Sequence, residues 1–523
     1  MLRKQKNLMF CIFVLCAALI AGLVAWFLRP TQQYIGGEPQ ESLKPVLRLP
    51  GGDWGPPAPY LHYSRGPGVY KMQLVFDSLL ERDGSGYIPW LATGYQVLDQ
   101  GRTYVFKLRH GVKWHDGRKL TPEDVLFSFE YALRHPPVQA HITSENITMS
   151  VEEDSFIVHL DFPDAAMLGK LGSVRIIPKH IYENIEDPIG FLEPSAFIGT
   201  GPFKLEQYNR EHGTYRFVEN SDFFGPAPKV SAIEFVPVSD ETLALLQGDL
   251  DAATIPPDAI SLFADLEQFA VMQNPGFWGY RLLFNMNVEP LGSIKFRQAL
   301  AHGIDRQQLV EKIARGAGVL GSYGILPVDH INYNPQVIDY PYDPELAKQL
   351  IAEEEIAIPS LSILVAGERE ARIGQLLKEQ LAEMGIELNI RSVDAKTKDT
   401  LIQTGQYQLG LIGHGGMGMD PDYLRIRFAQ EKAGQMISQV SSVGFANDEI
   451  NRLCLKQRKT TDESLRQDYL NQLQNLIAEN IPEIPLFCTT DYFVYNREKL
   501  DGWVYMFDHH EPTHCKMSYL VHP

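Results

Sequence analysis

The sequence predicts an α/β protein built from more than one lobe. With 523 residues, the chain is too long for one ordinary hydrophobic core, which favours two or three lobes. Residues 360–366, 370–384 and 386–391 have the patterns of a strand, a helix and a strand, and Gly385 is placed to end the helix. A βαβ unit of this kind implies parallel strands joined by a right-handed crossover. A further strand is expected at residues 408–413.

The charge balance excludes one class of partner. The formal net charge is -18, and no basic stripe follows residue 6. Nucleic-acid binding is not expected, because phosphates require clustered Lys and Arg.

Cysteine usage does not indicate a metal site. Beyond the N-terminal segment lie only Cys454, Cys488 and Cys515, with none in CxxC spacing. An odd count of three without that spacing makes neither a zinc site nor a disulfide scaffold. Two alternatives remain open: Cys488 and Cys515 form a disulfide bridge, or all three cysteines are buried free thiols.

The N-terminal segment predicts a membrane interaction. Basic residues before position 7 precede an uncharged run through residue 28, which is long enough to cross a bilayer with the N-terminus inside. Residues 1–30 are therefore a signal peptide or an anchor formed by residues 8–28. The lack of a clear small-x-small cleavage site favours the anchor. Residues 31–44 are a linker, and the rest of the chain is expected to work outside the cytoplasm.

Residues 104–134 predict the most detailed local structure. Apolar residues alternate over 104–109, as in a half-buried strand, and Asp116-Gly117 marks a tight turn. Thr121 is placed to cap a helix that runs to residue 134, with Pro122 in its first turn.

Other elements follow from apolar periodicity. A helix is expected at residues 69–80, and strands at 278–287 and 484–495. Arg175 interrupts an apolar, strand-like run. It either reaches solvent or pairs with a glutamate, or it binds a ligand carboxylate in a cleft.

No enzyme motif is present. The chain lacks HExxH, Walker A and GxSxG, although an undetected hydrolase with a dispersed site remains an alternative. His115 in a tight turn is expected to make a local hydrogen bond rather than to catalyse. His509, His510 and His514 are expected to form a solvated tail rather than a metal site.

Residues 413–418 fit GxGxxG, and a strand precedes them. The third glycine lies before the following helix, which does not suit dinucleotide binding. A glycine-rich loop between strand and helix can instead let a ligand approach the backbone.

The pattern of residues 104–134 resembles the signature of family 5 extracytoplasmic solute-binding proteins, the peptide and nickel binders of ABC importers. Residues 198–205, 246–252, 296–306 and 342–348 match further family motifs, in the family's order.

This resemblance implies an α/β, two-lobed fold of the periplasmic-binding-protein type, in its type II, large peptide-binding class, with a hinge and a cleft between the lobes. Lobe 1 would comprise residues 45–277 plus 490–523, and lobe 2 residues 278–489.

The same resemblance implies the role of a substrate-binding protein of an ABC importer. The protein would capture a small peptide or peptide-like solute and deliver it to a membrane permease with its ATPase subunits. It would be a monomer with no cofactor and no enzymatic activity. The alternatives are a nickel-chelate or metallophore binder of the same family and an anchored sensor.

Peptide-binding members resembling this chain carry a glycine-flanked acid that pairs with the ligand's ammonium. When residues 413–422 are aligned with that pattern, Met417 occupies the position of the acidic residue, and His414 occupies a position where relatives usually carry an aromatic residue. Either Asp420 or Asp422 pairs with the ammonium in place of the missing acid, or the ligand has no free amine at this position. A His near a Met would also suit a metal chelate as the ligand. The alternative is that His414 only lines the pocket and Met417 only fills space in the packing. The expected ligand-binding residues are Arg65, Arg175, His414, Met417, Asp420 and Asp422, with His414 as the candidate metal ligand.

Overall fold

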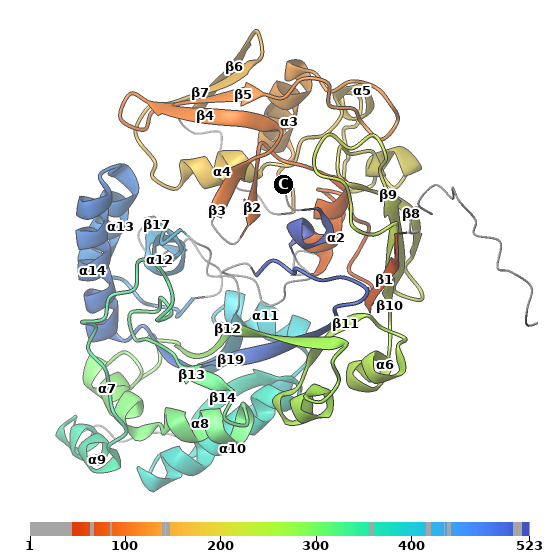
Figure 1. The fold of residues 1–523 in the computed structure, drawn as a ribbon. Coiled ribbons are helices and arrows are strands. Elements are labelled where there is room, and N and C mark those ends of the chain that lie inside the picture. The colour runs from red at the N-terminus through yellow and green to blue at the C-terminus, as the bar shows by residue number, and fades with distance from the viewer. Residues whose placement is uncertain are drawn as a thin grey trace, which may run out of the picture. The chain divides into compact units, whose positions relative to one another are not determined.

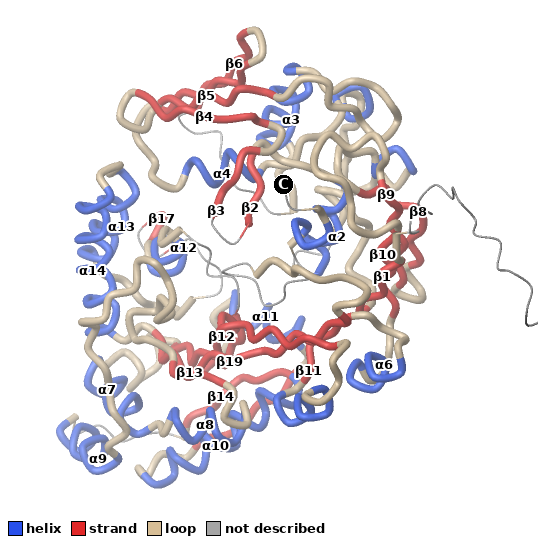
Figure 2. The backbone as a smooth tube through the Cα atoms, in the orientation of Figure 1, coloured by secondary structure: helices blue, strands red, loops and turns tan. Residues whose placement is uncertain are grey.

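The structure is a computed structural model that combines helices with several β-sheets (Figures 1 and 2). It describes residues 44–62, 67–83, 86–138, 142, 147–354, 360–414, 420–432, 435–436, 441–505 and 515–521. In these segments no helix is long and apolar enough to cross a membrane. The apolar run through residue 28, expected to interact with the membrane, lies outside the described residues.

Two four-stranded sheets and a hairpin are built from the first part of the chain. The first sheet has the order β1 (Val46–Pro50), β10 (Ala232–Val236), β9 (Thr214–Glu219) and β8 (Phe203–Asn209). The second has the order β4 (Ala92–Leu98), β5 (Thr103–Leu108), β7 (Ser155–Leu160) and β6 (Ile147–Glu152). β2 (Leu80–Asp83) and β3 (Gly86–Pro89) form the hairpin.

A seven-stranded sheet contains both strands expected to cross between lobes. Its order is β11 (Ala252–Ile255), β19 (Glu483–Asn496), β12 (Phe269–Phe284), β16 (Leu409–His414), β14 (Leu361–Ala366) and β15 (Leu388–Val393), with β13 (Gly318–Leu320) also paired to β19. β12 and β19 run antiparallel side by side. The first of them begins at Phe269 rather than at residue 278, so its predicted start was too late.

The predicted βαβ unit is present. β14 and β15 pair in parallel, with Leu361 opposite Leu388, and α10 (Gly367–Glu383) connects them. Gly385 follows the helix at φ +79°, the left-handed conformation that glycine adopts without strain. β16 pairs in parallel with β14, so the strand expected at 408–413 is confirmed.

The remaining elements are helices, 3-10 turns and a small ribbon. The helices are α2 (Pro67–Val75), α3 (Pro122–Arg134), α4 (Met167–Ser173), α5 (Lys179–Tyr182), α6 (Glu241–Gln247), α7 (Ile294–Gly303), α8 (Arg306–Ile313), α9 (Pro344–Glu353), α11 (Ala395–Gln403), α12 (Tyr423–Phe428), α13 (Asp448–Lys459) and α14 (Glu463–Asn480). Three 3-10 turns and a two-stranded ribbon complete the described chain: η1 (Pro194–Phe197), η2 (Pro257–Phe263), η4 (Lys516–Tyr519), β17 (Gln430–Lys432) and β18 (Gln435–Met436).

The capped helix at residue 121 forms as predicted. The Thr121 hydroxyl accepts from the backbone N–H of Asp124, and the Asp124 carboxylate accepts from the backbone N–H of Thr121 at 2.8 Å. This reciprocal arrangement satisfies two N–H groups that the first turn leaves unpaired.

The helix expected at residues 69–80 ends earlier, at Val75. The reason is a close approach that only glycine permits. A Cβ on Gly199 would lie 1.9 Å from the Val75 carbonyl oxygen, so residues 199–201 pack directly on the backbone where the helix stops. Asp77 and Ser78 then carry buried polar contacts instead of helical ones.

Buried apolar side chains divide into two sets of clusters. One set draws on residues 47–272 and 493–520, and the other on residues 278–487. Cys454, Cys488 and Cys515 are buried free thiols, which confirms the second of the two alternatives for these cysteines.

Candidate functional site

His115 joins two of the sequence motifs. The backbone N–H of Gly199 donates to Nδ1 of His115 at 3.4 Å, and Nε2 lies 3.0 Å from the Gly201 carbonyl oxygen. Nε2 therefore carries the proton and donates it. Burial lowers the pKa of His115 to about 4. The residue is a neutral hydrogen-bonding link between the turn and residues 198–205. The expected local hydrogen bond was therefore wrong, because both side-chain partners lie more than 80 positions along the chain.

Arg175 lies in a buried ion-pair network. Its Nη1 donates to Ser78 Oγ and the Phe76 carbonyl oxygen, each at 3.2 Å, and pairs with Glu81. Nζ of Lys516 lies 2.6 Å from carboxylate oxygens of both Asp77 and Glu81. Burial opposes ionisation of Glu81, but the charges of Arg175 and Lys516 outweigh it and hold the pKa of this carboxyl below its usual value.

Of the alternatives for Arg175, the structure therefore supports pairing with a glutamate, Glu81. Arg65 lies outside the described residues.

Around residue 413 the chain is crowded by an indole ring. A Cβ on Gly413 would lie 2.9 Å from Nε1 of Trp278 in β12, so β16 can end against this ring only with a glycine there. The side chain of His414 and the whole of Met417 lie outside the described residues.

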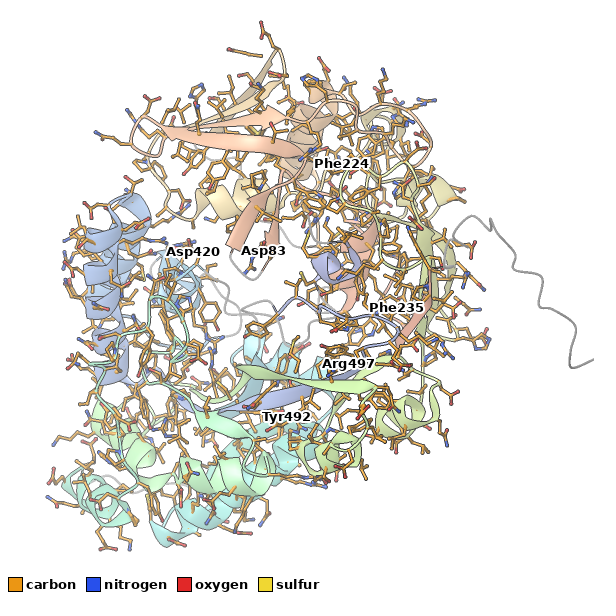
Figure 3. The ribbon with its side chains drawn as sticks, in the orientation of Figure 1. Asp83, Phe224, Phe235, Asp420, Tyr492 and Arg497 are labelled. Carbon is orange, nitrogen blue, oxygen red and sulfur yellow. The ribbon has the colours of Figure 1, made fainter. Side chains whose placement is uncertain are left out.

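Asp420 and Asp422 both have basic partners. Asp420 lies just before α12 (Figure 3) and accepts from Nη2 of Arg466 at 2.6 Å. The Asp422 carboxylate accepts from Arg425 at 2.8 and 2.7 Å and from Gln457 at 2.9 Å. Burial opposes ionisation of Asp422, but Arg425 outweighs it and holds the pKa below its usual value.

A buried group of three charged side chains was not predicted from the sequence. Nη1 of Arg281 in β12 lies 3.2 Å from Oε1 of Glu483 and 2.8 Å from the Tyr423 hydroxyl. Arg427 in α12 donates to Oε2 of Glu483 from Nε at 3.1 Å and from Nη2 at 2.7 Å. Arg281 and Glu483 each interrupt an apolar strand run. That same signal identified Arg175 and could have identified these two.

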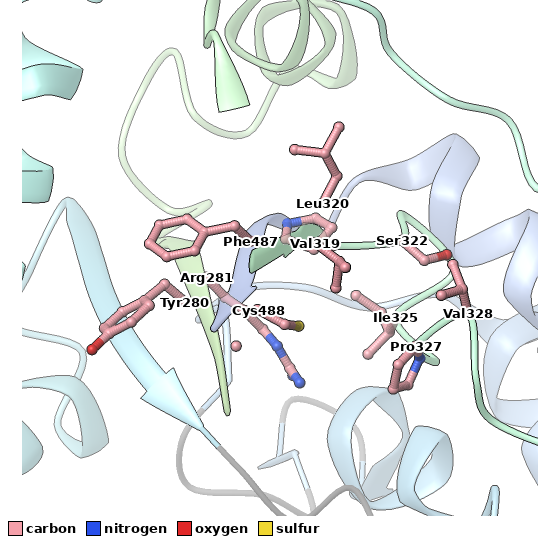
Figure 4. A pocket seen from close by; sticks show the side chains of 13 residues that line it. Tyr280, Arg281, Val319, Leu320, Ser322, Ile325, Pro327, Val328, Phe487 and Cys488 are labelled. Carbon is pink, nitrogen blue, oxygen red and sulfur yellow. The ribbon is translucent and has the colours of Figure 1, made fainter. Parts of the chain in front are cut away.

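A pocket opens beside this group. Figure 4 shows the Arg281 side chain extending past Cys488 among apolar neighbours. The lining residues come from β12, β19 and the segment around β13: Gly279, Tyr280, Arg281, Val319, Leu320, Gly321, Ser322, Ile325, Pro327, Val328, Pro485, Phe487 and Cys488.

Nowhere in the described segments are three or more His, Cys, Asp or Glu side chains grouped so that they could bind a metal ion.

Residues 86–435 match the family model described as bacterial extracellular solute-binding proteins, family 5 Middle. Di/tripeptide-binding protein 1 of Pseudomonas aeruginosa is 27% identical over 464 residues, which cover 80% of this chain and 84% of that protein. Heme-binding protein A of Haemophilus influenzae is 27% identical over 453 residues, 79% of this chain and 81% of that protein.

Among solved structures, NikZ from Campylobacter jejuni in complex with Ni(L-His) superposes with a TM-score of 0.76 at 22% identity, covering 91% of this chain and 99% of NikZ. This match confirms the predicted fold class.

Proposed function

This chain belongs to the bacterial extracellular solute-binding proteins of family 5, the substrate-binding components of ABC importers, and we propose that it captures a small peptide or peptide-like solute between two lobes. The captured solute is delivered to a membrane permease that works with ATPase subunits. The family binds solutes rather than converting them, and its members act outside the cytoplasm.

The single observation that carries the two-lobed binding mode is the division of the core. One set of buried clusters ends at residue 272 and resumes at residue 493, and the other spans 278–487. Paired strands β12 and β19 connect the two sets. We therefore place lobe 1 at residues 45–277 plus 490–523 and lobe 2 at residues 278–489, with ligand-driven closure about these strands.

For the ligand, the state of Asp420 and Asp422 favours one branch of the sequence prediction. Each carboxylate already accepts charged hydrogen bonds from an arginine. Moving either one to an ammonium would leave a partly buried guanidinium without its carboxylate partner, which is unfavourable. A peptide-like ligand without a free α-amine at this position is therefore favoured, and a nickel chelate is the second candidate because it presents no ammonium there.

Calorimetry with a matched ligand series tests this proposal. Tripeptides, the same tripeptides with acetylated N-termini, and nickel-histidine are titrated into the protein. We expect acetylation to leave peptide affinity nearly unchanged, whereas binding of nickel-histidine alone would select the second candidate. Tight binding that is lost on acetylation, in the wild type and in both Asp420→Asn and Asp422→Asn, would contradict the proposal. Turnover of peptide instead of saturable binding would favour the hydrolase alternative.

The N-terminal apolar run supports tethering of the protein to the outer face of the cytoplasmic membrane. Fractionation is expected to place the protein with membranes, and intact-mass analysis to find residues 1–30 retained. A mature N-terminus near residue 26 would instead identify a cleaved signal peptide. Neighbouring genes for a permease and ATPases separate a transport role from a sensor role.

A further inference from the structure

The corner between α13 and α14 contacts the part of lobe 1 that precedes α4. Nε and Nη2 of Arg458 donate to Oδ2 of Asp164 at 2.9 and 2.6 Å. The backbone N–H of Ala165 donates to the Arg458 carbonyl oxygen at 2.7 Å. Nζ of Lys459 lies 5.0 Å from the centroid of the Phe162 ring, which is within the range of a cation–π contact. Three neighbouring contacts therefore tie a corner of lobe 2 to lobe 1.

The same corner also fits closely against Gly101 of lobe 1. A Cβ on Gly101 would lie 2.5 Å from Cγ2 of Thr461 and 3.8 Å from its Cβ. Gly101 has φ +85°, a left-handed conformation that glycine adopts without strain. The absence of a side chain at this position lets the corner approach the backbone of lobe 1.

The ion pair at this corner can separate without leaving a buried charge unpaired. Within lobe 1, the Asp164 carboxylate also accepts from the backbone N–H of Ala166 at 3.0 Å and from Nζ of Lys170 at 3.2 Å. The Arg458 side chain is 24% exposed, whereas that of Arg427, in the buried group inside lobe 2, is 3% exposed. Water can therefore solvate Arg458 when it leaves, and Asp164 keeps a cation. Losing a buried pair is costly only where one charge remains without a partner.

We propose that residues 458–461 of lobe 2, together with residues 101 and 162–165 of lobe 1, form a latch that engages when the lobes close and separates when they open. The inference rests on the proposed function, since it takes the two-lobed binding mode as given. The latch stabilises the closed state alone, and a solute binds more tightly when its binding-competent state is more populated. Because the latch does not contact the solute, it raises the affinity for different solutes by the same factor.

A disulfide across the latch tests its engagement without any solute. The two Cβ atoms of a disulfide lie roughly 3.5–4.5 Å apart, a range that includes the 3.8 Å between positions 101 and 461. The double variant Gly101→Cys with Thr461→Cys is incubated with oxidised glutathione, and the cross-linked peptides are quantified by mass spectrometry.

We expect this double variant to cross-link, and Arg458→Met in the same background to slow the reaction about tenfold, because one charged hydrogen bond fewer disfavours closing by about that factor. Arg452→Met is the matched control, since Arg452 pairs with Glu449 of its own helix. It should leave the rate of cross-linking unchanged.

Calorimetry provides a second measurement that does not require a cysteine at a position of positive φ. Trialanine, its N-acetylated form and nickel-histidine are titrated into the wild type and into Arg458→Met. We expect every probe that the wild type binds to bind the variant about tenfold less tightly, with the same factor for each. Arg452→Met should bind these probes as the wild type does.

A folded double variant that does not cross-link, or a rate that Arg458→Met leaves unchanged, would overturn the latch. If the cysteine variant does not fold, unchanged affinities in Arg458→Met would overturn it. A loss of affinity for one probe but not for another would also do so, because Arg458 would then contact the solute itself. Failure of the wild type to bind any probe would count against the proposed function, whereas the cross-linking answers separately for the latch.

Discussion

Arg458, near the end of α13, donates two hydrogen bonds to Oδ2 of Asp164, from Nε at 2.9 Å and from Nη2 at 2.6 Å. Asp164 and Arg458 lie in the chain segments from which the two different sets of core clusters are drawn. Their contact therefore joins these segments away from β12 and β19. The backbone N–H of Ala165 also donates to the Arg458 carbonyl oxygen at 2.7 Å.

We expect Arg458→Met to loosen the connection between the two sets. A hydrogen bond between charged groups contributes about 1–3 kcal/mol, and Lys170 at 3.2 Å still partly neutralises Asp164. The ligand-free variant should show a larger radius of gyration than the wild type by X-ray scattering. Arg452→Met is the control, because Arg452 pairs with Glu449 of its own helix. Identical scattering from the wild type and Arg458→Met would refute this role.

Lys516 is predicted to anchor the C-terminal segment. It is 3% exposed and contacts both Asp77 and Glu81. Removing one partner of a buried ion pair costs about 3–5 kcal/mol, so Lys516→Met should lower the free energy of unfolding, measured in urea, by about that amount. Lys295→Met is the control: Lys295 is 54% exposed and lies 3.7 Å from Glu353, and such surface pairs contribute little. Equal stability of the two variants would show that the network around Lys516 is dispensable.

The sequence predicted what local residues determine. The cap of α3 depends on Thr121 and Asp124, three positions apart, and the βαβ unit on periodicity within residues 360–393. Local patterns could not show that α2 stops at Val75, because the cause is Gly199, more than a hundred positions away. They also could not show that β12 begins at Phe269, because pairing with β19 extends the strand beyond its apolar run.

The candidate site was less predictable for the same reason. Arg281 and Glu483 are 202 positions apart, and only the pairing of β12 with β19 makes them neighbours. Arg175 was recognised as an unusual charge in an apolar run, but its partners Glu81 and Ser78 depend on tertiary contacts. The ion pairs of Asp420 and Asp422 with residues of α12 and α14 could likewise not be inferred from a loop motif.

His115 should make the protein sensitive to mild acid. In the unfolded chain this imidazole takes up a proton near pH 6.5, whereas burial holds the pKa in the folded protein at about 4. Between these values the unfolded state binds more protons, so stability falls as pH decreases, by at most about 1.4 kcal/mol per pH unit. Protonation at Nδ1 would also turn a donor toward the N–H of Gly199.

The comparison is with His115→Gln, whose amide can donate and accept in a similar place without titrating. Urea unfolding at several pH values between 4 and 7 should show a steeper loss of stability for the wild type than for the variant. Parallel pH profiles for the two proteins would contradict this assignment.

Glu483 should matter more for stability than either of its arginines. Its carboxylate is buried and accepts from both Arg281 and Arg427. Glu483→Gln removes the negative charge while leaving two buried guanidinium groups close together, which combines lost pairing with like-charge repulsion. Arg281→Met leaves the closer pair of Glu483 with Arg427 intact. We expect the glutamine variant to lose about 3–5 kcal/mol of unfolding free energy and the methionine variant clearly less.

The double variant Arg281→Met with Glu483→Gln should recover part of the loss, because only one guanidinium then remains. Measured by urea denaturation, a double variant as unstable as the sum of the two single variants would show that the three charges do not act as one group.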